Sequence, residues 1–312
     1  MEGQGDIKMN NKYIIALLKC KGIGNTRLFD FIKECDFNID KIKLNINKLI
    51  SLDDYNNFNQ ILSNAELEIN ENEKKGIKLI TILDDNYPSK LYTISDPILY
   101  LYYKGNIELI NTVSIAVIGT RKPSELSKNN SYKLSLGLVR QNYTIVSGLA
   151  LGIDTIAHKA SVENNGNTIA VLPCGIDNIQ PTSNRGLAED IINSNGCLVS
   201  EYSVGTVLNR FNYAKRDRIQ SALSNVIVVP EASEKSGTMI AVNKSKKERK
   251  PVFQLIDNNN KLIDNVLDIE NDDYLDIIKE AVELDVNNEK QKEANIKNIR
   301  KISKQISLFD SY

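Results

Sequence analysis

The chain has 312 residues, of which 41% are hydrophobic and 25% are charged, a composition that is typical of globular proteins and excludes a fibrous or fully disordered chain. Its 39 lysine and arginine residues balance 40 aspartate and glutamate residues, which argues against a uniformly basic nucleic-acid binder but leaves room for a local basic patch. No apolar run reaches the ~18 residues of a membrane span and no signal-peptide pattern opens the chain, so we expect a cytoplasmic protein with no membrane partner.

Cysteine and histidine are scarce, and this limits the chemistry that the chain can perform. The four cysteines show no CxxC spacing, which predicts reduced thiols and no metal site or cofactor. His158 is the only histidine, so a hydrolase with a histidine base would have to use it, and a metal site with several histidines is excluded. A buried position in a helix is the simpler interpretation of His158.

Residues 1–75 predict a small helical domain. Apolar residues at helical spacing lie on both sides of the run Lys21-Gly-Ile-Gly-Asn25. A Gly-x-Gly turn between two helices is typical of a helix-hairpin-helix-like element that binds DNA phosphates, because glycine lets backbone N–H groups approach an anion. A plain turn inside a helical bundle explains the same residues, since glycine commonly ends helices.

Residues 76–256 predict an α/β domain with an N-terminal extension. Residues 78–110 have short apolar runs and are expected to form a connector that packs on this domain. Continuous apolar runs then predict buried strands at 113–118, 143–146, 168–172, 197–200, 226–229 and 251–255. Helical patterns separate them, and this alternation predicts a doubly wound, mostly parallel, Rossmann-like sheet.

Residues 257–312 are rich in Asn, Asp, Lys and Glu and predict a polar helical tail, with modest helices at 274–284 and 294–305. Just before this tail, the basic run 244–250 lies late in a predicted helix. It fits either a solvated helix face that compensates the helix dipole or a stripe that contacts the DNA backbone.

Glycine-containing loops follow several of the predicted strands. In open parallel sheets, ligands bind beyond the carboxyl ends of the strands, where these loops gather. The loops at 119–122, 147–154, 174–177 and 231–238 combine glycine with hydroxyls, cations or a following helix N-terminus, and the run 215–218 adds further cations. Any one loop fits ordinary turn geometry, but four on one sheet edge predict a phosphate-binding face. Neither GxGxxG nor GxxxxGK[ST] occurs there, which disfavours an oxidoreductase or an NTPase.

These loops also resemble a known family. The runs at 115–121 (IAVIGTR), 146–154 (VSGLALGID), 168–177 (TIAVLPCGID), 200–202 (SEY), 216–219 (RDRI) and 236–238 (SGT) are similar, in order, to the DNA processing protein A (DprA/Smf) family over roughly residues 80–255. The resemblance implies a non-enzymatic protein that binds single-stranded DNA and helps to load the RecA recombinase during natural transformation or related DNA uptake. It also implies a homodimer.

The loop argument and the resemblance together select a set of candidate residues that contact DNA phosphates, and no catalytic residue. These are Gly119, Thr120, Arg121, Lys122, Ser147, Gly148, Lys215, Arg216, Arg218, Ser236, Gly237 and Thr238. We expect bases to stack on a nearby aromatic residue such as Tyr213.

Three departures from the family pattern mark a divergent member. Leu151 stands where the family usually has an arginine, and Asp217 stands where it usually has an asparagine. Both changes are expected to weaken DNA binding, with partial compensation by Lys215 and Lys235. The tail does not resemble the winged-helix domain that many members carry.

The last residues resemble a docking peptide. Gln-x-Ser-Leu-Phe at 305–309 is similar to the peptide by which bacterial proteins bind the DNA polymerase sliding clamp, with Leu308 and Phe309 in an apolar pocket and Gln305 bonded to its rim. Alternatively, Leu308 and Phe309 pack back on the protein.

Two other functions use the same loops. Phosphoribohydrolases of the same nucleotide-binding superfamily carry a catalytic glutamate in the loop that corresponds to 236–241, but Ala241 stands at that position here. A sensor of a small nucleotide needs the same phosphate subsites as a DNA-binding protein, so the sequence does not separate these two.

Overall fold

The structure is a computed structural model that describes the backbone of residues 3–256, 262–271 and 273–309, and side chains at 10–256, 262–271 and 273–291. The chain forms two compact units, and each is described by itself. The first comprises Met1–Leu101 with Asn287–Tyr312, and the second Tyr102–Val286. The predicted domains 1–75, 76–256 and 257–312 remain a prediction, since a grouping by contacts does not establish which segments fold on their own.

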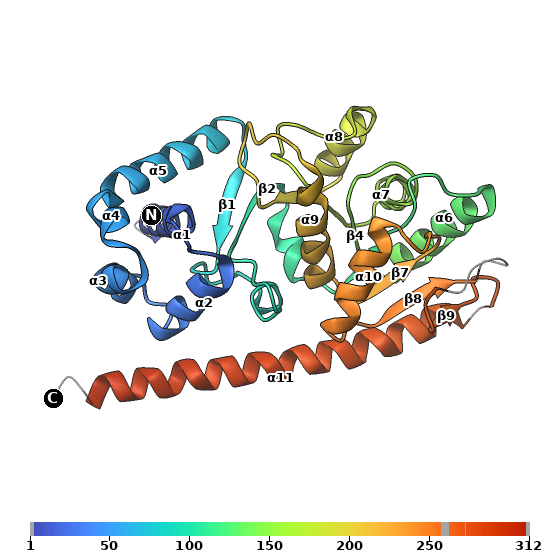
Figure 1. The fold of residues 1–312 in the computed structure, drawn as a ribbon. Helices are drawn as coiled ribbons and strands as arrows, with labels where there is room; N and C mark the ends of the chain where they lie inside the picture. Colours follow the sequence, from blue (N-terminus) through green and yellow to red (C-terminus); the bar gives the residue numbers. More distant parts are fainter. Residues whose placement is uncertain (1–2, 257–261, 272, 310–312) are drawn as a thin grey trace. The chain divides into compact units, whose positions relative to one another are not determined.

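The N-terminal unit contains the helices that the apolar spacing predicts (Figure 1). They are α1 (Gly3–Lys19), α2 (Asn25–Glu34), α3 (Ile39–Leu49), α4 (Leu52–Asn56) and α5 (Phe58–Lys74), followed by strand β1 (Lys78–Thr81) and the short helix η1 (Ser89–Leu91). Fully buried aliphatic side chains from successive helices, among them Leu17, Ile32 and Ile42, form the core of this unit. An ion pair of Lys12 with Glu66, at 2.7 Å, connects α1 to α5.

The second unit is built on a mostly parallel sheet, which confirms the predicted fold class. Its strands are β2 (Tyr100–Gly105), β3 (Ser114–Val117), β4 (Thr144–Ser147), β5 (Thr168–Val171), β6 (Cys197–Ser200), β7 (Val226–Val229), β8 (Val252–Leu255) and β9 (Val266–Leu267). They are ordered β2-β6-β5-β4-β3-β7-β8-β9. Among the described strands of this unit, only β2 pairs antiparallel, with β6.

Helices cover both faces of this sheet (Figure 1). They are α6 (Glu125–Arg140), α7 (Ile153–Glu163), α8 (Arg185–Asn193), α9 (Arg210–Leu223), α10 (Gly237–Lys247) and the start of α11 (Tyr274–Phe309), with short η2 (Ile107–Asn111) and η3 (Thr182–Asn184). Alternate residues of β3 face opposite layers: Ile115 packs in a cluster with α6, α7 and α11, whereas Ala116 packs in a cluster with α10. Burial on both faces explains why the strands appear in the sequence as continuous apolar runs.

Two predictions about the ends of this region are corrected. The segment 78–110, expected to be a connector, contains strands β1 and β2. The burial of β2 is mixed, since only Leu101 and Tyr102 of its six residues are buried, so its sequence lacks the continuous apolar run that identifies the other strands. The tail is one 36-residue helix and not two modest ones. Between the two predicted segments lies a polar stretch of Asn, Glu, Lys and Gln without apolar periodicity, and the good helix formers in it continue the helix.

Two further properties concern possible partners. Among the described residues, no helix is both long and apolar enough to span a bilayer. No group of three or more His, Cys, Asp or Glu side chains in the described part of the chain has an arrangement that could hold a metal ion.

Candidate nucleic-acid interface

A pocket of about 380 Å³ opens beyond the carboxyl ends of β3 and β7. The chain proceeds from β3 through β4 and β5 to β6 on one side of the sheet and then crosses to β7 on the other side of β3. The pocket therefore lies at the point where the strand order reverses, the usual ligand position in doubly wound folds. Its lining residues are Ile118, Gly119, Thr120, Arg121, Lys122, Ala150, Asp154, Tyr213, Arg216, Asp217, Gln220, Ser236, Gly237, Thr238 and Ala241.

The loop after β3 is held between two neighbouring loops. A Cβ on Gly119 would lie 2.6 Å from Cγ1 of Ile153 and 2.8 Å from the carbonyl oxygen of Glu231, so only glycine fits. The Thr120 N–H donates to the Glu231 carbonyl at 2.9 Å, and the Thr120 carbonyl accepts from the Ile153 N–H at 3.2 Å. These bonds fix the backbone that carries the exposed side chains of Arg121 and Lys122 at the pocket rim.

Arg121 lies over an aromatic ring of helix α9. The guanidinium carbon of Arg121 is 4.9 Å from the ring centroid of Tyr213, a cation–π distance. The contact orients the arginine without neutralising its charge, which remains available to an anion. It also covers one face of the ring that we expected to stack on bases.

A buried arginine reaches the pocket from the same helix. Arg216 is only 5% exposed, and its Nη1 donates to the carbonyl oxygen of Val171 at 3.3 Å. A Cβ on Gly148 would lie 1.1 Å from that Nη1, so the absent side chain of Gly148 is the space that the guanidinium fills. Gly148 therefore serves to admit Arg216 and is not itself part of the pocket lining.

Two carboxylates lie beside Arg216. Asp154 Oδ2 is 3.8 Å from Arg216 Nη1, and Asp217 Oδ1 is 3.1 Å from Arg216 Nε. Burial raises the pKa of both carboxyl groups, and the Arg216 guanidinium opposes that rise most strongly. Asp154 also accepts the N–H groups of Gly148 and Ala150, at 3.1 and 3.4 Å, which closes the loop after β4.

The third side of the pocket is the beginning of α10. Ser236 is the N-cap residue, and its hydroxyl accepts from the Met239 N–H at 3.4 Å. The first turn contains no acidic residue, so the partial positive charge at the helix N-terminus is not compensated within it. Gly237 and Thr238, in this first turn, line the pocket.

Most of the predicted phosphate-binding residues come together in this pocket, namely Gly119, Thr120, Arg121, Lys122, Arg216, Ser236, Gly237 and Thr238. Ser147, Gly148, Lys215 and Arg218 do not line it. Ser147 is fully buried and its hydroxyl donates to the Val117 carbonyl at 2.6 Å, so it connects two strands. Arg218 is buried on another side of α9, where Nη2 lies 2.6 Å from both carboxylate oxygens of Glu201. Lys215 is exposed.

Sequence reasoning did not select Asp154 or Gln220. Gln220 follows Arg216 and Asp217 at helical spacing and therefore shares their face of α9, a signal that was present in the sequence. Asp154 lies in a loop that was assigned to the phosphate-binding face because of its glycines. The side chain of Asp154 points inward because of the turn at Gly152, whose φ is +78°.

His158 occupies the buried position that the sequence predicts. It is fully buried in α7, and Nδ1 lies 2.8 Å from the Thr168 hydroxyl. Burial, together with the charge of Arg216, lowers the pKa of His158 to about 3. The neutral ring is shielded from solvent, which removes the one histidine on which a histidine-dependent hydrolase would rely.

The glycine turn of the N-terminal unit already holds an anion of the protein itself. Gly22 has a φ of +76°, and the N–H of Lys21 donates to Asp54 Oδ2 at 3.0 Å. The carboxylate of Asp54, which also accepts from the Ser51 hydroxyl, occupies the place that a DNA phosphate would need. The geometry thus favours the plain-turn interpretation over a helix-hairpin-helix phosphate site.

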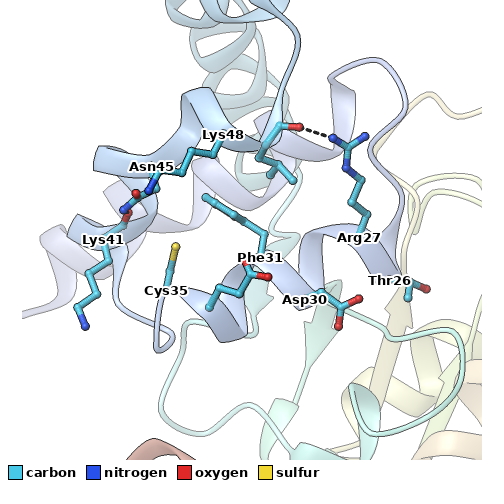
Figure 2. Close-up of a pocket in the computed structure, with 10 residues that line it drawn as sticks. Thr26, Arg27, Asp30, Phe31, Cys35, Lys41, Asn45 and Lys48 are labelled. Atoms are coloured by element: carbon cyan, nitrogen blue, oxygen red, sulfur yellow. Dashed lines mark hydrogen bonds between the residues drawn. The ribbon is translucent and has the colours of Figure 1, made fainter. Parts of the chain in front are cut away.

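A second pocket, of about 590 Å³, lies between α2 and α3 of the same unit (Figure 2). Its charges have both signs: α2 contributes Arg27, Asp30 and Glu34 to the lining, and α3 contributes Lys41 and Lys48. Figure 2 shows the bond from Arg27 to the main chain of α3, where Nη2 donates to the Leu49 carbonyl at 2.7 Å. Lys41 pairs with Asp36 at 2.6 Å. This pocket therefore has less uncompensated positive charge to offer to an anion than its lysines suggest.

The basic run 244–250 does not form one continuous surface. Lys244, Lys246 and Lys247 lie in the last turn of α10, where cations stabilise the helix dipole. Lys250, in contrast, is buried and its Nζ lies 2.9 Å from Asp285 Oδ2 in α11. The solvated-face interpretation is wrong for Lys250, because it pairs with an acid that is distant in sequence.

The predicted clamp peptide lies largely outside what the structure describes. The backbone of Gln305, Leu308 and Phe309 belongs to the end of α11, whereas their side chains lie outside the described residues.

The fold and pocket define a Rossmann-like protein with a pocket at the topological switch point of its sheet, lined by the cations Arg121, Lys122 and Arg216. Comparison with known proteins identifies the family. The model of the family described as "DNA recombination-mediator protein A" matches residues 78–268, and the chain belongs to this family. This confirms the family resemblance seen in the sequence.

Several relatives are similar to the chain. Protein Smf of Synechocystis sp. is 38% identical over 191 residues, 60% of this chain and 48% of the relative. DNA processing protein DprA of Streptococcus pneumoniae is 38% identical over 175 residues, which are 56% of this chain and 61% of the relative. The chain thus spans about half to three-fifths of the length of these two. Protein Smf of Borreliella burgdorferi is 34% identical over 233 residues, 73% of each chain.

Two solved structures are also similar. The X-ray structure of DprA from Streptococcus pneumoniae superposes with a TM-score of 0.64 at 29% identity, covering 86% of this chain and 92% of that one. A DNA processing protein A from Helicobacter pylori, described by its single-stranded DNA binding mode, gives a TM-score of 0.53 at 34% identity and covers 59% and 83%.

Proposed function

We propose that the chain binds the phosphodiester backbone of single-stranded DNA in the pocket at the carboxyl ends of β3 and β7. The observation that carries this proposal is the placement of Arg121 and Lys122, exposed at the rim, around the buried guanidinium of Arg216. Glycine loops let a phosphate approach the backbone there, and the α10 N-terminus adds its dipole. The DNA-binding description of the Helicobacter pylori relative supports the choice of ligand.

The pocket supports binding and not catalysis. Ala241 lines the pocket at the position where related phosphoribohydrolases would carry a catalytic glutamate. The carboxylates that are present, Asp154 and Asp217, are both adjacent to Arg216. We therefore assign the chain the role of a DNA-binding mediator in the cytoplasm, with no enzymatic step.

As a mediator, the chain would hold single-stranded DNA for a RecA recombinase during DNA uptake or recombination, and would act as a homodimer. Membership of the DNA recombination-mediator protein A family supports the mediator role, and RecA and the homodimer extend the proposal beyond the pocket itself. Docking of Gln305, Leu308 and Phe309 on the polymerase sliding clamp is a separate part of the proposal, supported by the sequence of the tail. Loss of a clamp interaction on truncation after Lys304 would support that part, and an unchanged interaction would overturn it.

The experiment for DNA binding measures the affinity of a fluorescent oligothymidylate for the full chain and two arginine variants. Arg121→Ala removes a rim cation and is expected to weaken binding about tenfold, because a charge-assisted hydrogen bond contributes ~1.5–3 kcal/mol. Arg140→Ala is the matched control, since Arg140 is exposed at the end of α6 that precedes β4, at the opposite edge of the sheet. Equal affinities of the three proteins would overturn the assignment, and competition by a mononucleotide at equal phosphate concentration would favour the small-nucleotide sensor.

A further inference from the structure

The cation at the base of the pocket is bracketed by two acids of this chain. Arg216 has Asp217 at 3.1 Å from Nε and Asp154 at 3.8 Å from Nη1, and their side chains are 6%, 15% and 7% exposed respectively. Within this buried group, two negative charges therefore face one positive charge. A DNA phosphate that approaches Arg216 meets a site whose own charge is negative when both acids are ionised.

The two acids are held differently. Asp154 accepts the N–H groups of Gly148 and Ala150, which stabilise its ionised form. Asp217 accepts from no backbone N–H in the described hydrogen bonds, and Arg216 Nε makes no well-aligned hydrogen bond to it, so that pair is mainly electrostatic. With the amide nitrogen of Gln220 turned toward it, Asp217 Oδ1 gains one neutral donor at 3.2 Å. Asp217 is thus the acid that can take up a proton at lower cost.

Charged groups from every neighbouring element face Asp217. Arg216 is on its own helix, Asp154 comes from α7, Arg121 from the loop after β3 and Lys244 from α10. The side chains of arginine and lysine keep their charge across neutral pH. His158, close enough to Arg216 to be influenced by its charge, stays neutral because its pKa lies at about 3. Among these charged groups, the two acids are therefore the ones whose charge can change as the pH falls from neutral.

We propose that DNA binding in this pocket is coupled to protonation of Asp217. The inference rests on the proposed function, since it concerns how the same pocket accepts a phosphate. A phosphodiester beside Arg216 competes with the carboxylate of Asp217 and repels it. When Asp217 is protonated, the repulsion disappears and its O–H becomes a donor that can bind a phosphate oxygen.

The direction of the effect follows from linkage. A bound anion raises the pKa of an adjacent carboxyl group further, so the complex holds more protons than the free protein. DNA affinity must therefore rise as the pH falls through the titration of Asp217. Burial already raises the pKa of Asp217 above its usual range, which brings this titration closer to neutral pH. The phosphodiester itself does not change charge in the same interval, so the DNA does not contribute to the effect.

The experiment compares the full chain with Asp217→Asn, Asp217→Glu and Arg121→Ala, using one fluorescent oligothymidylate at constant ionic strength from about pH 4.5, close to the ordinary range of a carboxyl group, to pH 8.5. Asparagine cannot ionise, so we expect Asp217→Asn to bind on the order of tenfold more tightly at pH 8.5, as removal of a unit charge a few ångströms from the phosphate allows. The advantage should shrink toward the acidic end of this range, where the unchanged chain gains affinity. Asp217→Glu should keep the pH dependence. Thermal unfolding of each variant shows that it is folded.

The outcomes separate this inference from the proposed function. If Arg121→Ala weakens binding while Asp217→Asn binds like the unchanged chain at every pH, the pocket binds DNA and the coupling is wrong. A gain in Asp217→Asn that is constant across the pH range also contradicts the coupling. If Arg121→Ala binds as tightly as the unchanged chain, the proposed function itself fails.

Discussion

Gly148→Ala tests whether the missing side chain at this position is what admits Arg216 to the pocket. The added Cβ would lie 1.1 Å from Arg216 Nη1 and 2.3 Å from its guanidinium carbon, far inside contact distance. The guanidinium must therefore leave the position where it donates to the Val171 carbonyl. Its departure removes the cation beside the buried carboxylate of Asp154.

The magnitude follows from that lost partner. Removing one member of a buried ion pair costs ~3–5 kcal/mol, because the other charge is left without compensation. A DNA phosphate loses a charge-assisted donor as well, which corresponds to a ten- to hundredfold weaker affinity at ~1.5–3 kcal/mol. We thus expect Gly148→Ala to lower both the free energy of unfolding and the DNA affinity.

The assay is urea unfolding followed by oligothymidylate binding, with Gly186→Ala as the control. A Cβ on Gly186, near the start of α8, would meet no atom within 4 Å. The control should therefore be neutral or more stable by up to ~1 kcal/mol, because alanine favours a helix over glycine. Gly148→Ala with a stability and affinity within experimental error of the unchanged chain would refute the role assigned to this glycine.

Three further predictions concern buried side chains that can carry a charge. Arg218→Met should lower the free energy of unfolding by ~3–5 kcal/mol by removing the cation beside the buried carboxylate of Glu201, while the salt dependence of DNA binding stays the same; a shallower salt dependence would show that Arg218 contacts DNA. Because the pKa of His158 is lowered to about 3, the unfolded chain binds its proton first, so stability should fall as the pH drops from 6.5 toward 3. His158→Gln should flatten that part of the unfolding profile, and an identical profile would contradict this. Lys250→Met should destabilise the second unit by ~3–5 kcal/mol, with recovery when Asp285 is replaced by Leu as well; a double variant no more stable than the single one would count against a buried pair.

The sequence predicted the sheet well because both of its faces are buried. Residues such as Ile115 and Ala116 are apolar on opposite sides of the same strand, so strands appear as continuous runs bounded by glycine loops. The position of the pocket followed from the rule that ligands bind where these loops gather. Strand β2 was not predicted because its burial is mixed, with two buried residues among six, and its sequence has no continuous apolar run.

The directions of individual side chains could not be predicted in the same way. Arg216 and Arg218 are both basic residues of one helix, yet a separation of two residues places them on different sides of it. Ser147 resembles a loop hydroxyl in the sequence, but as the last residue of β4 it bonds to β3 inside the sheet. These hydrogen-bond and ion-pair partners belong to elements that are distant in the chain, so local sequence patterns do not predict them.

The most direct test of the central claim is the salt dependence of oligothymidylate binding by the unchanged chain and by Arg121→Ala. If the pocket holds DNA phosphates, the logarithm of the affinity falls linearly with the logarithm of the salt concentration, with a slope of about −0.7 for each phosphate neutralised on a single strand. Arg121→Ala should then have a slope that is smaller in magnitude by about 0.7. The same slope and affinity in both proteins would contradict the claim that this pocket binds DNA.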